Sequence, residues 1–174
     1  MYYGAIKFND IANGPGVRTA VFVSGCTLKC KGCFQPETWD FNYGTKYTKE
    51  TQEEILESLK PEWILGLTVL GGEPFEPQNQ KEVYELIAAA KQAFPNKTVW
   101  LYTGHTLREL CESEKVRTEY TDKIMDLLDV MVEGRFVLAK RNLNLDFCGS
   151  ENQRVLDMNK TRLQHTPVLW TRGK

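Results

Sequence analysis

The sequence predicts an α/β fold in which a mostly parallel sheet and its helices form a partial, open barrel. Three observations support this prediction. The chain has 174 residues and 41% hydrophobic content, which is enough for one domain with a buried core. Short β-branched runs alternate with helical patterns, and Gly or Pro residues separate several of them. This alternation leaves a doubly wound sheet as the alternative, and we favour the partial barrel.

Five apolar runs are expected to form strands. The first, GVRTAVFVSG, begins at Gly16, is rich in β-branched residues and leads directly into Cys26. The second, GLTVLGGEP, is stopped by paired glycines, and the later runs are TVWLYTG, DVMVEG and QRVLD. The first strand therefore delivers Cys26 to a loop that follows the strand's carboxyl end.

Four segments between these runs predict helices. The first is expected over 49–60, because Thr48 is a favourable N-cap, acidic residues come early and Lys60 precedes Pro61. The second is QKEVYELIAAAKQAF, which ends before Pro95. A polar helix is expected over 106–118 and another near 121–127. Strands and helices therefore alternate as in a series of βα units.

The charge balance and the cysteine content limit the kinds of partner and location. The 22 basic and 23 acidic side chains nearly cancel, so we expect direct binding neither to nucleic acid nor to a membrane. The opening MYYGAIKFND lacks the pattern of a signal peptide, and no later run reaches transmembrane length. Five cysteines without signs of secretion argue against a disulfide framework and for a reducing, cytoplasmic location.

We expect one core domain over residues 1–157. It contains no solenoid repeat and no low-complexity segment. The tail, residues 158–174, is basic and weakly patterned, which is typical of either a docking segment or a frayed end.

A loop of eight residues contains three of the five cysteines, Cys26, Cys30 and Cys33. Three thiolates this close together can converge on one cluster, and soft sulfur ligands suit iron–sulfur clusters. A [4Fe-4S] cluster that only transfers electrons usually has four cysteine ligands, so three leave one iron open to an external molecule. The spacing therefore favours a cluster that takes part in chemistry.

Two other interpretations of this loop stay open. A zinc site would need a fourth donor such as Cys111, Cys148 or His105, and the loop lacks the paired spacing of structural zinc sites. The three thiols could instead be small buried residues, although their closeness beside Lys29 and Lys31 argues against it. Cys111 and Cys148 are each far in sequence from a second cysteine, and we expect both to be structural thiols.

The turn Gly71–Pro74, with sequence GGEP, follows the second predicted strand. In a barrel it would lie on the same carboxyl edge as the cysteine loop. Glycines permit the close approach of a ligand, and Glu73 offers an acceptor to a cationic amino group. Alone, such a turn is more often an ordinary strand-to-helix connection. Beside the cysteine loop, it indicates a ligand site.

The cysteine loop, with three and then two residues between its cysteines, resembles the cluster loop of the radical S-adenosylmethionine enzymes. This resemblance implies a six- or eight-stranded barrel, here the open parallel βα barrel of the radical S-adenosylmethionine type. The family often has an aromatic residue just before the third cysteine, whereas here Gly32 occupies that position and Phe34 follows the cysteine. This difference from the family pattern indicates a subgroup of the radical S-adenosylmethionine enzymes.

The resemblance also implies the ligands. Cys26, Cys30 and Cys33 would hold a [4Fe-4S] cluster. The GGEP turn matches the family motif that binds the amino group of S-adenosylmethionine, and residues around the third cysteine contact its adenine. The implied contacts of S-adenosylmethionine are Gly32, Cys33, Phe34, Gly71, Gly72, Glu73 and Pro74.

Further segments resemble the activating proteins of anaerobic ribonucleoside-triphosphate reductase, short members of the group that activates glycyl-radical enzymes. In family order they are NGPG, GCTLKCKGCFQPETWDF, TVLGGEPFEPQN, WLYTGH, DVMVEGRF and GSENQR. The resemblance covers nearly the whole chain to about Asp157.

This resemblance implies an oxidoreductase. A one-electron donor such as flavodoxin or ferredoxin would reduce the cluster, and S-adenosylmethionine would be cleaved to methionine and a 5′-deoxyadenosyl radical. The radical would take hydrogen from a glycine of the large reductase subunit and leave a stored glycyl radical. One rival is an activator of another glycyl-radical enzyme, such as pyruvate formate-lyase. From another class, the rival is a non-catalytic iron–sulfur or zinc module.

Four further residues are candidates for contact with S-adenosylmethionine. Tyr102 ends the third predicted strand, where an aromatic side chain is as often part of the core. Glu133 and Arg135 follow the next strand, and a surface ion pair is the simpler interpretation of both. Arg154 could pair with a ligand carboxylate or make a structural contact that closes the barrel.

Overall fold

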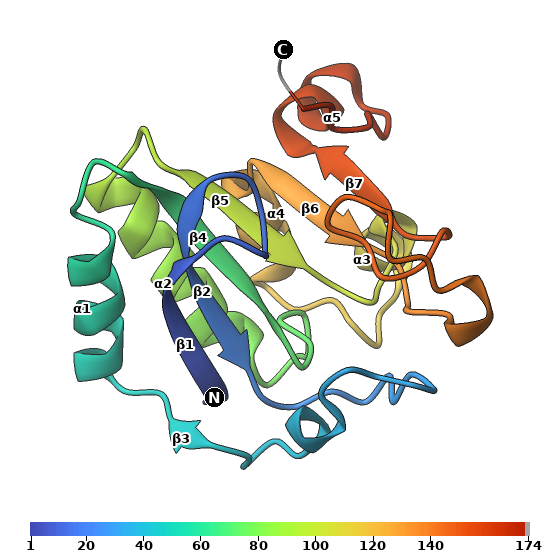
Figure 1. The fold of residues 1–174 in the computed structure, drawn as a ribbon, viewed down its shortest axis with the longest axis horizontal. Helices are drawn as coiled ribbons and strands as arrows, with labels where there is room; N and C mark the ends of the chain where they lie inside the picture. The colour runs from blue at the N-terminus through green and yellow to red at the C-terminus, as the bar shows by residue number, and fades with distance from the viewer. Residues whose placement is uncertain (173–174) are drawn as a thin grey trace.

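The computed structural model describes residues 1–172 and contains a seven-stranded sheet with helices packed against it (Figure 1). It belongs to the α/β class that the sequence predicts. In chain order the elements are β1 (Tyr2–Asp10), β2 (Val17–Val23), η1 (Pro36–Trp39), β3 (Thr45–Lys46), α1 (Lys49–Ser58), β4 (Ile64–Gly71), α2 (Gln80–Ala93), β5 (Thr98–Tyr102), α3 (Leu107–Glu112), α4 (Thr121–Leu127), β6 (Val130–Glu133), η2 (Leu138–Lys140), β7 (Arg154–Asp157) and α5 (Met158–Gln164).

The sheet has the order β3-β1-β2-β4-β5-β6-β7 and is not closed. The central strands β2, β4, β5 and β6 are parallel, as predicted. Both edges are antiparallel, which differs from a continuous βα series. The physical reason at β7 is its connection: residues 134–153 contain only the short η2, so the chain leaves β6 and re-enters the sheet from the same end. A return without a crossover permits antiparallel pairing only.

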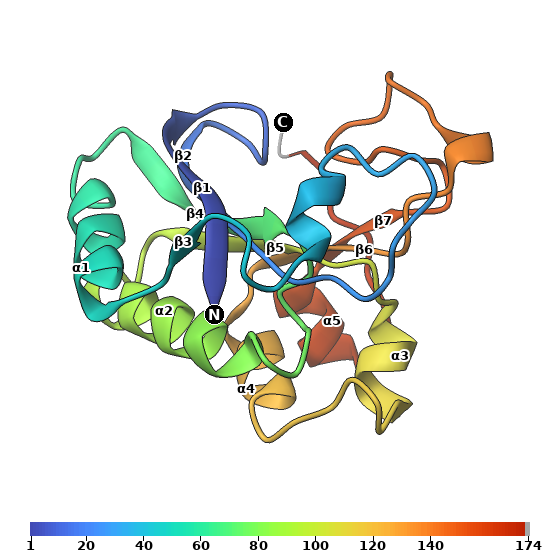
Figure 2. The same cartoon turned by 90° about the horizontal axis from the view of Figure 1, so that it is seen from below.

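The two faces of the sheet are covered differently. Figure 2 shows the α-helices on one side and long connecting segments on the other. Alternate strand residues such as Val69 and Leu101 pack against Leu86 and Ile124 in the main hydrophobic core beneath the helices. The opposite face carries a smaller cluster around Trp100, and it lies beneath segments 11–16 and 134–153. The helices therefore stabilise one face and leave the other to the loops.

Most helix boundaries agree with the sequence prediction. The first helix begins after Thr48, whose side chain forms a capping box with Thr51, and α4 has the predicted bounds. The helix expected over 106–118 is wrong in length, because α3 ends at Glu112. The chain turns at Ser113 and buries Val116 in the core. Burial of this apolar side chain favours the turn over a longer helix.

Arg18 is a buried cation that the sequence did not identify. From β2 it donates hydrogen bonds to Thr68 Oγ1 at 2.8 Å, to Thr98 Oγ1 at 2.9 Å and to two backbone carbonyls. Burial lowers its pKa to about 10, so it stays protonated at neutral pH. The hydrogen bonds of its guanidinium group connect β2, β4 and β5 at the end of the sheet away from the cysteines.

The described part of the tail packs on the domain. Met158 and Thr161 are buried on α5, and the Trp170 ring lies 5.1 Å from Trp100 and 5.9 Å from Phe147. The tail therefore contacts the domain through these residues, and its role in docking stays a prediction. Residues 173–174 of the predicted tail lie outside the described residues. None of the helices that residues 1–172 form has the length and apolar character needed to cross a membrane.

Replacing Trp170 with Ala should destabilise the whole domain. The substitution removes an aromatic ring from the cluster with Trp100 and Phe147, and we expect a loss of about 2 kcal/mol in the free energy of unfolding. Equilibrium unfolding in urea measures this change in the free energy of unfolding. Leu163, at 80% exposure on α5, provides the control, and Leu163→Ala should change the free energy by less than about 0.5 kcal/mol. Equal small changes in both variants would mean that the tail does not contribute to the fold.

Candidate metal centre

The carboxyl ends of the four parallel strands bring the predicted site segments to one edge of the sheet. The cysteines follow β2, the GGEP turn follows β4, Tyr102 ends β5 and Glu133 ends β6. The sequence prediction that the cysteine loop and the GGEP turn share this edge is therefore confirmed. Parallel α/β folds build their ligand sites at the same edge.

Backbone hydrogen bonds hold the start of the cysteine loop, which we define as residues 24–35, and close a turn within it. Gly25 N donates to Thr38 O at 2.8 Å, and Cys33 N donates to Cys30 O at 3.1 Å. Lys29 and Gly32 adopt left-handed backbone conformations, with φ of 45° and 77°, which curl the loop tightly. The loop is therefore a compact turn and not an extended connection.

The donor chemistry of this loop fits an iron–sulfur cluster. Cys26, Cys30 and Cys33 are free thiols, Cys26 is buried and the other two are half-buried. Burial raises the pKa of Cys26 to about 11 and also raises that of Cys30, so metal binding would have to displace their protons. Within residues 1–172, no three Cys, His, Asp or Glu side chains already form a metal-binding group. The three thiols that the predicted cluster needs are present in one loop, and their convergence on a metal stays a prediction.

The turn after β4 is joined directly to the cysteine loop. Gly72 N donates to Val23 O at 2.7 Å, and Glu73 N donates to Gly25 O at 2.9 Å. A Cβ atom on Gly72 would lie 2.6 Å from Gly25 O, a distance that side-chain-bearing residues do not tolerate. Gly72 is therefore required for this close approach, whatever it contributes to ligand binding.

Glu73 is fully buried and links β4 to β5. Its Oε1 accepts hydrogen bonds from Phe75 N at 2.9 Å and the Thr103 hydroxyl at 2.8 Å, and Oε2 accepts one from Gly104 N at 2.7 Å. Burial raises the pKa of Glu73 to about 7 and outweighs these three donors, which favour the anion. Leu28 packs on Gly104 beside Oε2. The carboxylate is therefore closed to solvent, with Leu28 beside it.

Glu76 is a second buried carboxylate, and it binds the cysteine loop itself. Its Oε1 accepts hydrogen bonds from Thr27 N at 2.5 Å and from the Thr27 hydroxyl at 2.6 Å. Asn79 adds a bond from Nδ2 to Ser24 O at 2.9 Å. The sequence analysis assigned no role to Glu76 or Asn79, and no signal in the sequence identifies them, because both contacts join residues about fifty positions apart.

Residues on either side of Cys33 contact the segment after β6. The rings of Phe34 and Phe136 have centroids 5.1 Å apart, and a Cβ on Gly32 would lie 3.0 Å from Leu138. Phe34 is 63% exposed. The structure therefore places Phe34 on the surface beside the predicted cluster, and its contact with adenine stays a prediction.

Two of the candidates from the later strands pair with each other. Glu133 is buried and accepts hydrogen bonds from Arg154 and from Leu107 N, which links β6, β7 and α3. Arg135 lies 3.9 Å from Glu109. Tyr102 lies half-buried on the loop-covered face, and burial raises its pKa. Contacts of all four candidates with S-adenosylmethionine stay predictions.

The possible fourth donors for zinc do not join the three cysteines in a metal-binding group of the described chain. Cys111 is exposed on α3, and Cys148 packs beside the Trp100 cluster. His105 is buried, burial lowers its pKa, and its Nδ1 has no hydrogen-bond partner among residues 1–172. The zinc interpretation therefore gains no support from the arrangement of these side chains.

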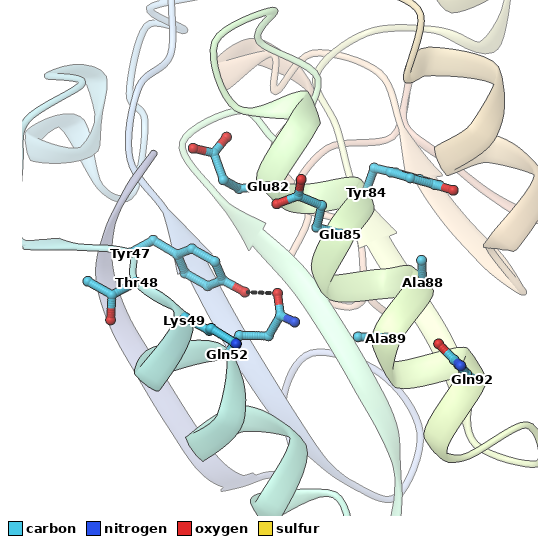
Figure 3. A pocket seen from close by; sticks show the side chains of 10 residues that line it. All are labelled: Tyr47, Thr48, Lys49, Gln52, Glu82, Tyr84, Glu85, Ala88, Ala89 and Gln92. Atoms are coloured by element: carbon cyan, nitrogen blue, oxygen red, sulfur yellow. Dashed lines mark hydrogen bonds between the residues drawn. The ribbon is translucent and has the colours of Figure 1, made fainter.

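A groove of about 580 Å³ lies elsewhere, between α1 and α2 (Figure 3). Figure 3 shows Glu82 and Glu85 on α2 opposite Tyr47 and Gln52, which share a hydrogen bond of 3.2 Å. Residues of the cysteine loop and of the GGEP turn do not line it. The groove is therefore separate from the candidate centre.

Comparisons with known proteins agree with the predicted family. A family model described as a 4Fe-4S single cluster domain matches residues 12–156. The chain is 39% identical over 146 residues to the anaerobic ribonucleoside-triphosphate reductase-activating protein of Vibrio cholerae serotype O1, covering 83% of this chain and 90% of that protein. Identity to the protein of the same name is 35% over 157 residues in Enterobacteria phage T4, covering 89% and 93%. It is 36% over 148 residues in Escherichia coli K12, covering 84% and 92%.

The fold and the family match together define a 4Fe-4S single-cluster domain protein. Within that class, the chain belongs to the family of anaerobic ribonucleoside-triphosphate reductase-activating proteins. The resemblance to these activating proteins, stated from the six segments between NGPG and GSENQR, is thereby confirmed.

Replacing Glu76 with Ala should reduce the amount of cluster that assembles. The substitution removes the acceptor that holds Thr27, which lies between the predicted ligands Cys26 and Cys30 in the chain. We expect the iron and sulfide content after anaerobic reconstitution to fall at least about twofold. The loss of the two hydrogen bonds should cost about 2 kcal/mol in the free energy of unfolding. Glu76→Gln keeps an Oε1 acceptor and should recover most of the cluster. Full iron content in Glu76→Ala would contradict the positioning role.

Proposed function

We propose that this protein cleaves S-adenosylmethionine reductively at a [4Fe-4S] cluster and generates a glycyl radical on anaerobic ribonucleoside-triphosphate reductase. The observation that carries the proposal is the hydrogen-bonded contact between the three-cysteine loop and the GGEP turn at the carboxyl edge of the sheet. Family membership supports the choice of target, because the relatives carry the name of activators of this reductase.

The proposed cluster ligands are Cys26, Cys30 and Cys33. These three thiolates would hold the cluster and would leave one iron without a protein ligand, where S-adenosylmethionine could bind. The chemistry that the bound groups supply is one-electron cleavage of the carbon–sulfur bond to methionine and a 5′-deoxyadenosyl radical, which takes a hydrogen atom from a glycine of the large subunit. The electron comes from a donor such as flavodoxin or ferredoxin.

The protein's own contribution is positioning and exclusion of water. Gly71 and Gly72 let the turn pack directly on the backbone of β2 and the cysteine loop. In this proposal the turn Gly71–Pro74 binds the amino group, and Glu73 offers its carboxylate. Oε2 of Glu73 accepts one hydrogen bond among residues 1–172, and a carboxylate oxygen has room for two. An ammonium group beside it would lower the pKa of Glu73 again and stabilise the anion. No separate acid–base pair is needed.

The proposed architecture is the partial βα barrel of the radical S-adenosylmethionine type, with the loop-covered face as its interior. The parallel centre of the sheet and the site at its carboxyl edge support this assignment. The sheet is open, so a backbone glycine of a large partner could approach from the side. We place the reaction in the cytoplasm, because free thiols and cluster assembly suit a reducing compartment.

The proposal predicts a defined cofactor and a defined product. Anaerobic reconstitution should give about four iron and four sulfide per chain. Addition of dithionite and S-adenosylmethionine should then yield 5′-deoxyadenosine and methionine, and addition of the reductase should yield a glycyl radical detected by electron paramagnetic resonance. One zinc without sulfide would support the non-catalytic module instead. Radical formation on pyruvate formate-lyase but not on the reductase would support the rival activator.

The cysteine assignment has its own test. Cys30→Ala should abolish the cleavage of S-adenosylmethionine, because Cys30 lies within the predicted ligand loop, whereas Cys111→Ala should leave it near the wild-type rate because Cys111 is exposed on α3. The measurements are the iron content and the 5′-deoxyadenosine formed per protein chain. Equal loss in the two variants would contradict the assignment.

A further inference from the structure

Four positively charged side chains surround the exposed side of the cysteine loop. Lys29 and Lys31 lie on the loop, and Lys140 and Arg141 lie at the end of η2, and all four are exposed. None of them has a salt-bridge partner within residues 1–172. Residues 26–34 and 134–141 contain no acidic residue, although the chain as a whole has a net charge of −1. Positive charge therefore predominates on these two segments, and the nearest acidic neighbour in the hydrogen-bond network is the exposed Glu151, whose N donates to Lys140 O at 2.9 Å.

The two segments that carry this charge form one continuous surface. Figures 1 and 2 both show them side by side, in blue and in orange. Lys31 and residues 136–139 line a shared groove of about 440 Å³, and the Arg141 guanidinium lies 5.6 Å from the centre of the Phe34 ring. Leu138, at 42% exposure, provides an apolar centre. We call the surface formed by Lys29, Lys31, Leu138, Lys140 and Arg141 the basic face.

The basic face adjoins the predicted cluster ligands from outside. Cys30 lies between Lys29 and Lys31 in the chain, and its side chain is only half-buried. On the inner side of the same loop, Thr27 contacts Glu76 and Leu28 packs on Gly104. The loop therefore has an inner side toward the proposed S-adenosylmethionine site and an outer side toward solvent.

We propose that the basic face is the docking surface for an acidic one-electron carrier protein. This inference rests on the function proposed above, and it adds the surface and the charge of the partner. The carrier would lose one electron and the cluster would gain it, with no bond made or broken. The charge and the apolar centre of the basic face favour the carrier as its occupant. The glycine of the reductase must instead reach the inner side of the cysteine loop, where the radical would form.

The size and chemistry of the basic face suit a transient encounter. Redox partners form small interfaces, and a charged rim around a limited apolar centre accelerates association without holding the complex long. Electrostatic steering changes association rates by factors of 10 to 1,000, and it weakens as salt screens the charges. An electron carrier that must dissociate after each transfer needs this kind of surface.

The test compares electron delivery by two reductants. The double variant Lys140→Glu/Arg141→Glu reverses two charges outside the ligand loop. The rate of cluster reduction by a purified flavodoxin of acidic isoelectric point, added in its fully reduced form, is measured by stopped-flow absorbance. It is divided by the rate with dithionite for the same variant. We expect this ratio to fall at least tenfold at low salt, following the magnitude of electrostatic steering. The Kd for flavodoxin, measured by calorimetry, should rise in parallel.

The control variant Lys49→Glu/Lys115→Glu makes the same change in net charge at exposed residues of α1 and of the loop after α3. Its ratio should stay within twofold of the wild type. An unchanged ratio in Lys140→Glu/Arg141→Glu would overturn the docking proposal. So would a variant that binds the reductase more weakly but binds flavodoxin with the wild-type Kd. Failure of the wild type to cleave S-adenosylmethionine with dithionite would instead overturn the proposed function, so the two failures are distinguishable.

Discussion

The structure depends on the contact between the ends of β2 and β4 at the carboxyl edge of the sheet. Because Gly72 has no Cβ, its N–H can reach Val23 O, and Glu73 N can reach Gly25 O. These two bonds continue the parallel pairing of the strands beyond their ends. They hold the start of the cysteine loop, just before Cys26, against the GGEP turn.

Two buried carboxylates extend this contact in opposite directions. Glu73 reaches toward β5 through Thr103 and Gly104, whereas Glu76 reaches back to Thr27 in the cysteine loop. Burying a carboxylate is costly unless donors surround it, and each of these accepts at least two hydrogen bonds. The same burial raises the pKa of Glu73, which makes the site responsive to a positively charged ligand. In the proposed function, Glu73 would therefore serve both the structure and the binding of the cosubstrate.

The two faces of the sheet are covered unequally. The helices bury one face in a large core, and the other face is covered by connecting segments and the tail residue Trp170. Because the loop-covered face has fewer apolar contacts, its segments can carry charge and present side chains to partners. The basic face lies at the outer end of these segments. In the proposed function, the cosubstrate and the target glycine use the inner side of the cysteine loop, and the electron carrier uses the outer side.

Local patterns determined much of this protein. The cap at Thr48, the β-branched runs and the spacing of Cys26, Cys30 and Cys33 are properties of neighbouring residues, so the sequence alone predicted the α/β class, most helix bounds and the shared edge of the two site segments. The antiparallel edges, the short α3 and the packed tail depend on which distant surfaces become buried. The bond from Thr27 to Glu76 and the meeting of residues 29–34 with 136–141 join segments far apart in the chain. Only the tertiary structure decides such contacts, because no local spacing records which loops the sheet brings together.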